Sequence, residues 1–171
     1  MARKRKLRVY LSGGMEYAHK EGSDWRLEME VWLDEVMSQE VFNPNKESAK
    51  YLSKKRISKN FRSMKEKDID RFMRLVRGIV DLDSREIAVR SDYVICYWDR
   101  SAMRGAGTKG EITLAKYFGK PVYMVTQYKP GKIPSWVLGC VDRIFPSFHK
   151  LKNFLSNASI RYHEGDGRIM P

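Results

Sequence analysis

Cysteine and histidine are scarce in this chain. Among its 171 residues there are two cysteines, Cys96 and Cys140, and three histidines. Two cysteines do not make a disulfide framework, and neither stands at metal-ligand spacing from another cysteine or a histidine. The sequence therefore predicts no disulfide-based stability and no zinc site, and we expect no metal or other cofactor.

Long apolar runs are also missing. No run approaches the roughly 20 residues that a membrane-spanning helix needs. The apolar stretch Leu7–Leu11, which follows a basic tail of residues 1–6, is too short for a signal-peptide core and is interrupted by Arg8. We therefore expect a cytoplasmic protein with no membrane partner. The 42% hydrophobic content and the lack of repeats favour one domain spanning residues 1–171.

Acidic residues are outnumbered by basic ones. The chain has 33 Lys and Arg against 21 Asp and Glu, a net charge of +12. This charge fits either a solvated basic surface, which we favour, or an attraction to phosphates on a nucleotide or a nucleic acid. Nine basic residues but only two acidic ones lie between 46 and 67, a segment that is either a mobile loop or a surface helix.

Short apolar runs alternate with helical patterns. Tyr93–Trp98 is unbroken and apolar, which is typical of a strand buried on both faces of a parallel sheet. Strands that alternate with helices predict a doubly wound α/β fold, and five strands suggest the order 2-1-3-4-5. The expected strands are 7–11, 41–42, 93–98, 121–125 and 141–145. The expected helices begin at 23–25, 69, 83, 108 and 148, and residues 160–171 are expected to be irregular.

The loops after the first, third and fourth strands are expected to meet at one edge of this sheet. Ligands of such sheets bind beyond the carboxyl ends of the strands. The loop after the first strand is Ser12–Ser23, and the loop after the third strand is Asp99–Glu111. The residue types in these loops therefore decide which chemistry is available.

Thr108 and Glu111 allow two interpretations. They match the T-x-x-E capping box, in which each side chain satisfies a backbone N–H at a helix start. Alternatively, Glu111 is a nucleophile that attacks an anomeric carbon and forms a covalent glycosyl-enzyme. The helix N-terminus would help to keep this carboxylate ionised and would favour a substrate phosphate.

Asp83 and Tyr10 are the partners that such a nucleophile needs. Asp83 is either the N-cap of a helix or a protonated carboxyl that donates to the leaving base while Glu111 attacks. Two carboxyls about 5 Å apart would suit a retaining double displacement. Tyr10, on the opposite face from Val9 and Leu11, is either a core residue or a hydroxyl that orients Glu111. Asp92 is expected to hold backbone amides.

Two stretches resemble the nucleoside 2-deoxyribosyltransferase family, whose relatives include nucleoside 5′-monophosphate N-glycosidases. The run Tyr10–Met15 (YLSGGM) is similar to that family's opening strand and loop. The run from Asp83 to Asp92, followed by YVICYWD and GTKGEITLAKYFGKPV, is similar to its second signature. The order and spacing also match, and the likeness covers most of 7–125.

The resemblance implies cleavage of an N-glycosidic bond, with transfer of the sugar to another base or to water. It implies that Glu111 is the nucleophile, Asp83 the acid and Tyr10 their partner, with no cofactor or metal and with assembly into homo-oligomers. The expected substrate-binding residues are Ser12, Gly13, Gly14, Met15, Asn43, Asp81, Asp99, Gly107 and Thr108.

The chain departs from the family at Gly105, where true transferases often carry an aspartate. This departure leaves a second hypothesis open, that of a module that binds a nucleotide without turning it over. A third hypothesis, a nucleic-acid-associated protein, rests on the net charge and on Tyr51 and Phe61 among the lysines, and we favour it least.

Overall fold

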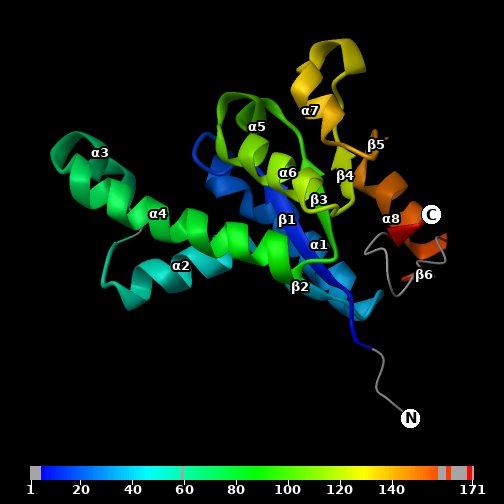
Figure 1. Ribbon diagram of the computed structural model, residues 1–171, viewed down its shortest axis with the longest axis horizontal. Coiled ribbons are helices and arrows are strands. Elements are labelled where there is room, and N and C mark those ends of the chain that lie inside the picture. Colours follow the sequence, from blue (N-terminus) through cyan, green and yellow to red (C-terminus); the bar gives the residue numbers. More distant parts are fainter. Residues whose placement is uncertain (1–4, 59, 158–160, 163–168, 171) are drawn as a thin grey trace.

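The computed structural model describes residues 5–58, 60–157, 161–162 and 169–170, and its centre is a five-stranded parallel sheet (Figure 1). The sheet has the order β2-β1-β3-β4-β5, so the predicted doubly wound fold is confirmed. Its strands are β1 (Arg8–Gly13), β2 (Glu40–Phe42), β3 (Tyr93–Tyr97), β4 (Val122–Val125) and β5 (Arg143–Phe145).

Helices cover both faces of the sheet, as unbroken apolar strands require. Strand β1 shows the division, because Val9 and Leu11 enter one core cluster and Tyr10 enters the other. Helices α1 (Ser23–Glu35) and α8 (Phe148–Asn157) pack on the Val9 side. The Tyr10 side is covered by the end of α4 (Ile69–Arg85), the π-helix η3 (Glu86–Arg90), α5 (Arg100–Arg104), α6 (Gly107–Tyr117) and α7 (Ser135–Gly139).

A helical arm, residues 44–80, extends from one end of the sheet (Figure 1). It consists of α2 (Pro44–Lys54), the short helices η2 (Phe61–Ser63) and α3 (Met64–Lys67), and most of α4. Its own small core contains Leu52, Phe61 and Phe72, with the last two rings stacked at 5.9 Å. The basic segment 46–67 is therefore largely helical, with Tyr51 and Phe61 packed inside the arm.

A glycine lets the two long helices of the arm approach each other. A Cβ atom at Gly78 of α4 would lie 2.0 Å from the hydroxyl oxygen of Tyr51 on α2. Glycine in a helix interior costs about 1 kcal/mol relative to alanine, so its presence here reflects this close approach.

Three predicted helix caps are wrong. Asp83 lies inside α4 and is not an N-cap, and α1 follows Gly22 in the left-handed region rather than a capping Ser23 or Asp24. Helix α6 starts after Ala106 with no side-chain cap, so Thr108 and Glu111 do not form a capping box.

The described residues of the predicted irregular tail form a short antiparallel pair, β6 (Arg161–Tyr162) with β7 (Ile169–Met170). The other residues of 160–171 lie outside the described part of the chain. Two further short helices occur in loops, η1 (His19–Gly22) and η4 (Pro130–Lys132). Within the described residues, no helix has the length and apolar character that a membrane crossing would need.

Candidate active site

The carboxylate of Glu111 is held by two hydroxyl groups from strand β1. Tyr10 donates to its Oε1 at 3.0 Å, and Ser12 donates to its Oε2 at 2.5 Å. Tyr10 and Ser12 are two residues apart on a strand and therefore point to the same face, over which α6 packs. Glu111 is half-buried, so its carboxylate is fixed at both oxygens while part of the side chain stays accessible.

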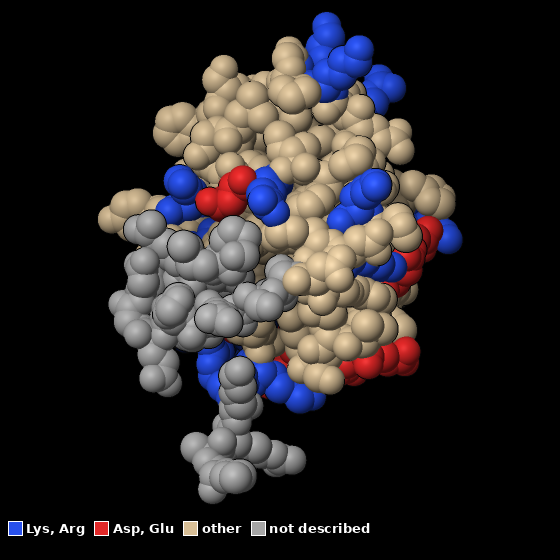
Figure 2. Space-filling view, turned by 90° about the vertical axis from the view of Figure 1, so that its right-hand side faces the viewer, with Lys and Arg blue, Asp and Glu red and all other residues tan. Residues whose placement is uncertain are grey.

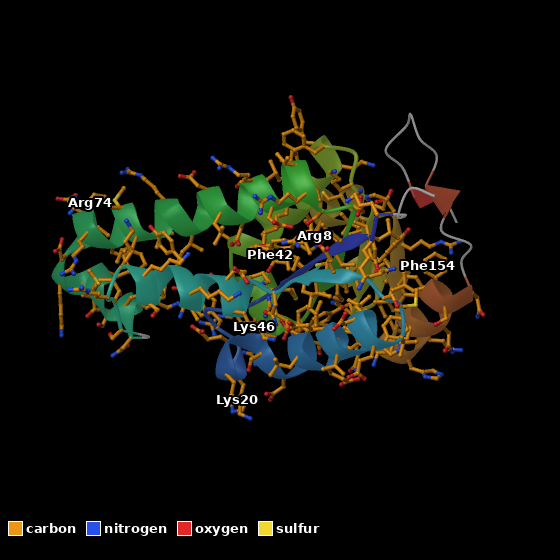
Figure 3. All side chains as sticks on the ribbon, turned by 90° about the horizontal axis from the view of Figure 1, so that it is seen from below. Arg8, Lys20, Phe42, Lys46, Arg74 and Phe154 are labelled. Carbon is orange, nitrogen blue, oxygen red and sulfur yellow. The ribbon has the colours of Figure 1, made fainter. Side chains whose placement is uncertain are left out.

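Tyr10 combines both of the roles that the sequence allowed. Its ring is fully buried and stacks on Phe42 of β2 at 5.3 Å, while its hydroxyl reaches Glu111 (Figure 3 labels Phe42). Burial raises the pKa of Tyr10 well above its ordinary value, and the negative charges of Glu111 and Asp83 add to this effect. Tyr10 therefore remains a hydrogen-bond donor to the carboxylate at any physiological pH.

Asp83 brings a second carboxyl to this cluster from the last turn of α4. Its Oδ1 atom is buried and has no hydrogen-bond partner in the described structure. Burial, with the negative charge of Glu111 next in size, raises the pKa of Asp83 from 3.8 to about 8, against smaller opposing effects of Tyr10 and Arg26. Asp83 is therefore mainly protonated at neutral pH.

Opposing effects act on the ionisation of Glu111. Burial raises its pKa above 4.5, while the hydrogen bond from Ser12, the charge of Arg26 and the hydrogen bond from Tyr10 act in the opposite direction. Each of these three groups stabilises the carboxylate form. An ionised Glu111 beside a protonated Asp83 would divide the roles of nucleophile and acid between the two carboxyl groups.

Arg26 is the main feature of this site that sequence reasoning missed. Its side chain is 1% exposed and donates to the backbone carbonyls of Leu11, Gly13, Gly14, Glu21 and Gly22, at 2.7 to 3.5 Å. Among the described residues it has no carboxylate in ion-pair contact, so its positive charge acts on Glu111 across the site. The helical spacing could have indicated that Arg26 is buried, because it lies three residues before Met29 and seven before Leu33, on the buried face of α1.

The arginine fixes a loop with an unusual backbone. Lys20, Glu21 and Gly22 lie in succession in the left-handed region, with φ of 47°, 55° and 66°. Such positions cost about 1–2 kcal/mol each for residues other than glycine. The carbonyls of Glu21 and Gly22 both accept from Arg26, which holds the turn in place.

We predict that Arg26→Met lowers the free energy of unfolding by about 3 kcal/mol, because five backbone carbonyls lose their donor. Urea unfolding measures this loss. Arg77→Met is the matched control, since Arg77 is exposed and we expect a change within about 0.5 kcal/mol there. Equal losses in both variants would contradict a special role for Arg26.

The loops after the first and third strands, both expected at this edge, do meet. A Cβ atom at Gly14 would lie 2.0 Å from the Ser101 hydroxyl and 2.8 Å from the Ala102 nitrogen, so only glycine allows this approach. Asp99 caps α5, accepting from the Ala102 amide at 2.9 Å and from the Ser101 hydroxyl at 2.5 Å. Asp99 thus orders the second loop in the described structure.

The structure places the other predicted binding residues in different settings. Asn43 is buried and caps α2, accepting from the Asn45 amide and donating to Glu30, so both ends of its side-chain amide are occupied. Asp81 is exposed on α4. Gly13 ends β1, Met15 follows it, and Gly107 and Thr108 form the first turn of α6. A role for these residues in binding stays a prediction.

Asp92 accepts a hydrogen bond from a backbone amide, as expected. The donor is the amide of Arg8, at 2.7 Å, which lies at the far end of β1 from the site. In the described part of the chain, no group of three or more histidine, cysteine or acidic side chains could hold a metal ion.

Comparisons with known proteins give limited information. No protein-family model and no curated protein matches the chain. Among solved structures, the CMP N-glycosidase BcmB from Clostridium botulinum is similar, with a TM-score of 0.48 and 17% identity. The similarity covers 87% of this chain and 98% of that one. A likeness this distant identifies neither a family nor a reaction.

Proposed function

We propose that this protein cleaves the N-glycosidic bond of a nucleoside or a nucleoside 5′-monophosphate, with Glu111 as the nucleophile. The observation that carries the proposal is the pairing of Glu111, held by Tyr10 and Ser12, with Asp83, whose pKa is raised to about 8. A fixed, ionised carboxylate beside a protonated one suits a retaining double displacement. No metal or cofactor takes part in this chemistry.

In the first step, a carboxylate oxygen of Glu111 attacks the anomeric carbon of the sugar. The bond from that carbon to the base nitrogen breaks, and its electron pair leaves with the base. Asp83 gives its proton to the departing base, so that the base leaves in neutral form. The product is a glycosyl ester on Glu111 and an ionised Asp83.

In the second step, water or the nitrogen of another base attacks the same carbon and releases Glu111 as a carboxylate. Asp83 accepts the proton of the attacking group, which restores the starting state. Tyr10 and Ser12 bind the carboxylate before attack and after release, and therefore orient the oxygen that reacts. The positive charge of Arg26 favours the ionised form of Glu111 before substrate binds.

The test is to incubate the protein with each nucleoside, deoxynucleoside and corresponding 5′-monophosphate and to follow free base by chromatography. Parallel reactions contain a second free base, which separates transfer from hydrolysis. Acid-quenched samples are examined by mass spectrometry for a glycosyl group on the peptide that contains Glu111. Base release with this adduct supports the proposal. Tight nucleotide binding without release from any substrate would overturn it in favour of a binding module.

A further inference from the structure

We propose that the arm, residues 44–80, is a binding surface for the phosphate backbone of duplex nucleic acid. Its sequence contains twelve Lys and Arg and four Asp and Glu, a net charge of +8. The whole chain has a net charge of +12, so most of the excess lies in this one helical extension. The described part of the face at the opposite end of the molecule shows mostly uncharged side chains, with scattered basic groups and some acidic groups beside them (Figure 2). This proposal does not depend on the glycosidase activity.

Many of the arm's cations are free to meet an external anion. Ion pairs occupy Lys46, Lys50, Arg62 and Lys65. In the described part of the arm, seven exposed cations take part in no ion pair: Lys54, Lys55, Arg56, Lys67, Arg71, Arg74 and Arg77. Their charge is not neutralised within the protein, so each can replace a counterion on a phosphate.

Helix α4 presents its arginines in a row. Arg71, Arg74 and Arg77 are three residues apart, about 4.5 Å along the helix axis, and all are exposed. Figure 3 places Arg74 toward the outer end of the arm, on the side of α4 that faces away from α2. Guanidinium groups bind phosphate oxygens in a bidentate manner, which suits a regularly charged backbone.

The arm is also held in a defined position. Arg62 pairs with Glu21, and Lys65 pairs with Glu16, so the short helices η2 and α3 are tied to the loop after β1. The phenyl rings of Phe61 and Phe72 and the Tyr51–Gly78 contact join the arm's helices to each other. The exposed cations are therefore carried by an ordered surface, which lowers the entropy cost of binding.

The aromatic residues distinguish a duplex from a single strand. Proteins that bind single strands stack bases on exposed aromatic rings. In the described part of the arm, Phe61 and Phe72 are buried and Tyr51 is packed against Gly78, so no aromatic ring is exposed. The arm thus offers charge to a backbone but no stacking platform, which favours the denser charge of a duplex.

A membrane surface and a second copy of the protein fit the arm less well than a nucleic acid does. Ile69, Met73 and Val80 are exposed on α4, but the described arm exposes none of the Trp, Phe or Leu side chains with which helices enter a membrane surface. A second copy docked arm to arm would bring two surfaces of charge +8 together, which costs electrostatic energy.

The experiment is a fluorescence-anisotropy titration of a labelled 20-base-pair DNA duplex at several NaCl concentrations. We expect log Kobs to fall with log salt at a slope of about −3.6 to −4.5, for about four or five neutralised phosphates. The arm variant Lys54→Gln/Arg71→Gln/Arg74→Gln should bind about 10-fold more weakly or worse at 0.1 M salt, with a slope shallower by about 2 to 3. The matched control, Lys116→Gln/Lys129→Gln/Lys132→Gln, removes the same charge elsewhere and should lose less than about 3-fold.

Four results would overturn the proposal. These are duplex binding that does not depend on salt, equal losses in the arm and control variants, tighter binding of the matching single strand, and binding of phosphatidylserine vesicles without binding of duplex. Sedimentation of each variant tests for a second copy, since a change in oligomeric state that explains the loss would also contradict a nucleic-acid role. Unchanged duplex binding by Glu111→Gln separates this surface from the proposed active site.

Discussion

Glu111→Gln should reduce the rate of base release by about 10⁴-fold or more, because a neutral amide cannot form the glycosyl ester. The substitution keeps the volume of the side chain, and its amide oxygen can still accept from Tyr10 or Ser12. We therefore expect a folded protein that still binds substrate, with the loss confined to kcat. Initial rates on the best substrate of the panel measure this effect.

Glu35→Gln is the matched control, since Glu35 is an exposed carboxylate at the end of α1. It should retain the wild-type rate and stability. Thermal unfolding should show that Glu111→Gln is at least as stable as wild type, because burial opposes the charge of Glu111 in the folded state. A Glu111→Gln rate within tenfold of wild type would rule out nucleophilic catalysis by this residue.

The fold could be predicted because its signals are local and strong. The apolar run that became β3 and the alternation of Val9, Tyr10 and Leu11 in β1 depend only on which faces are buried. These patterns, with the helices between them, leave few topologies. The same reasoning placed Tyr10 and Glu111 at one edge of the sheet, and the structure joins them by a hydrogen bond.

The errors arise where local and tertiary preferences compete. Thr108 and Glu111 have the spacing of a capping box, yet Glu111 instead accepts from two hydroxyls on a strand about 100 residues earlier. Asp83 and Ser84 would suit a helix start, but α4 continues through them because Leu82 and Ile87 pack in the core. The spacing of residues within one segment does not show which distant segments their side chains will contact.

Arg26 was missed, and the choice between loop and helix for 46–67 was left open, for a related reason. An arginine among apolar positions usually reaches solvent, and only the path of the following loop shows that five carbonyls surround it. The segment 46–67 has little apolar periodicity of its own, because Phe72 and Val76 of α4 complete its core. Its helices are stabilised by that packing more than by local sequence.

Asp83→Asn should have two opposite effects, a slower reaction and a more stable fold. The acid form of Asp83 donates the proton, so wild-type activity should fall as pH rises through about 8, where this carboxyl ionises. The amide has no acidic proton, and we expect base release to slow by about 10²- to 10³-fold and to lose this alkaline limb. Rates of base release from pH 5 to pH 10, measured on wild type and on Asp83→Asn, test the slower reaction and the loss of this limb.

The stability effect follows from the direction of the same pKa shift. Asp83 has a higher pKa in the folded state than its ordinary 3.8, so the folded state holds its proton more tightly than the unfolded chain does. The contribution of this proton to the free energy of unfolding is fully present below about pH 4 and is lost as pH rises toward 8. The amide in Asp83→Asn does not ionise, so the variant's advantage in free energy of unfolding should grow with pH, by up to about 1.4 kcal/mol per unit.

Urea unfolding at pH 5, 6.5 and 8 tests this, with Asp34→Asn as the control because Asp34 is an exposed carboxylate on α1 with no role in the proposed site. That variant should keep both the rate and the pH dependence of wild type. An alkaline limb that persists in Asp83→Asn would remove Asp83 from the proton transfer. A stability difference that stays constant between pH 5 and 8 would contradict its raised pKa. Both effects together would mean that the fold tolerates a destabilising buried acid because the reaction needs its proton.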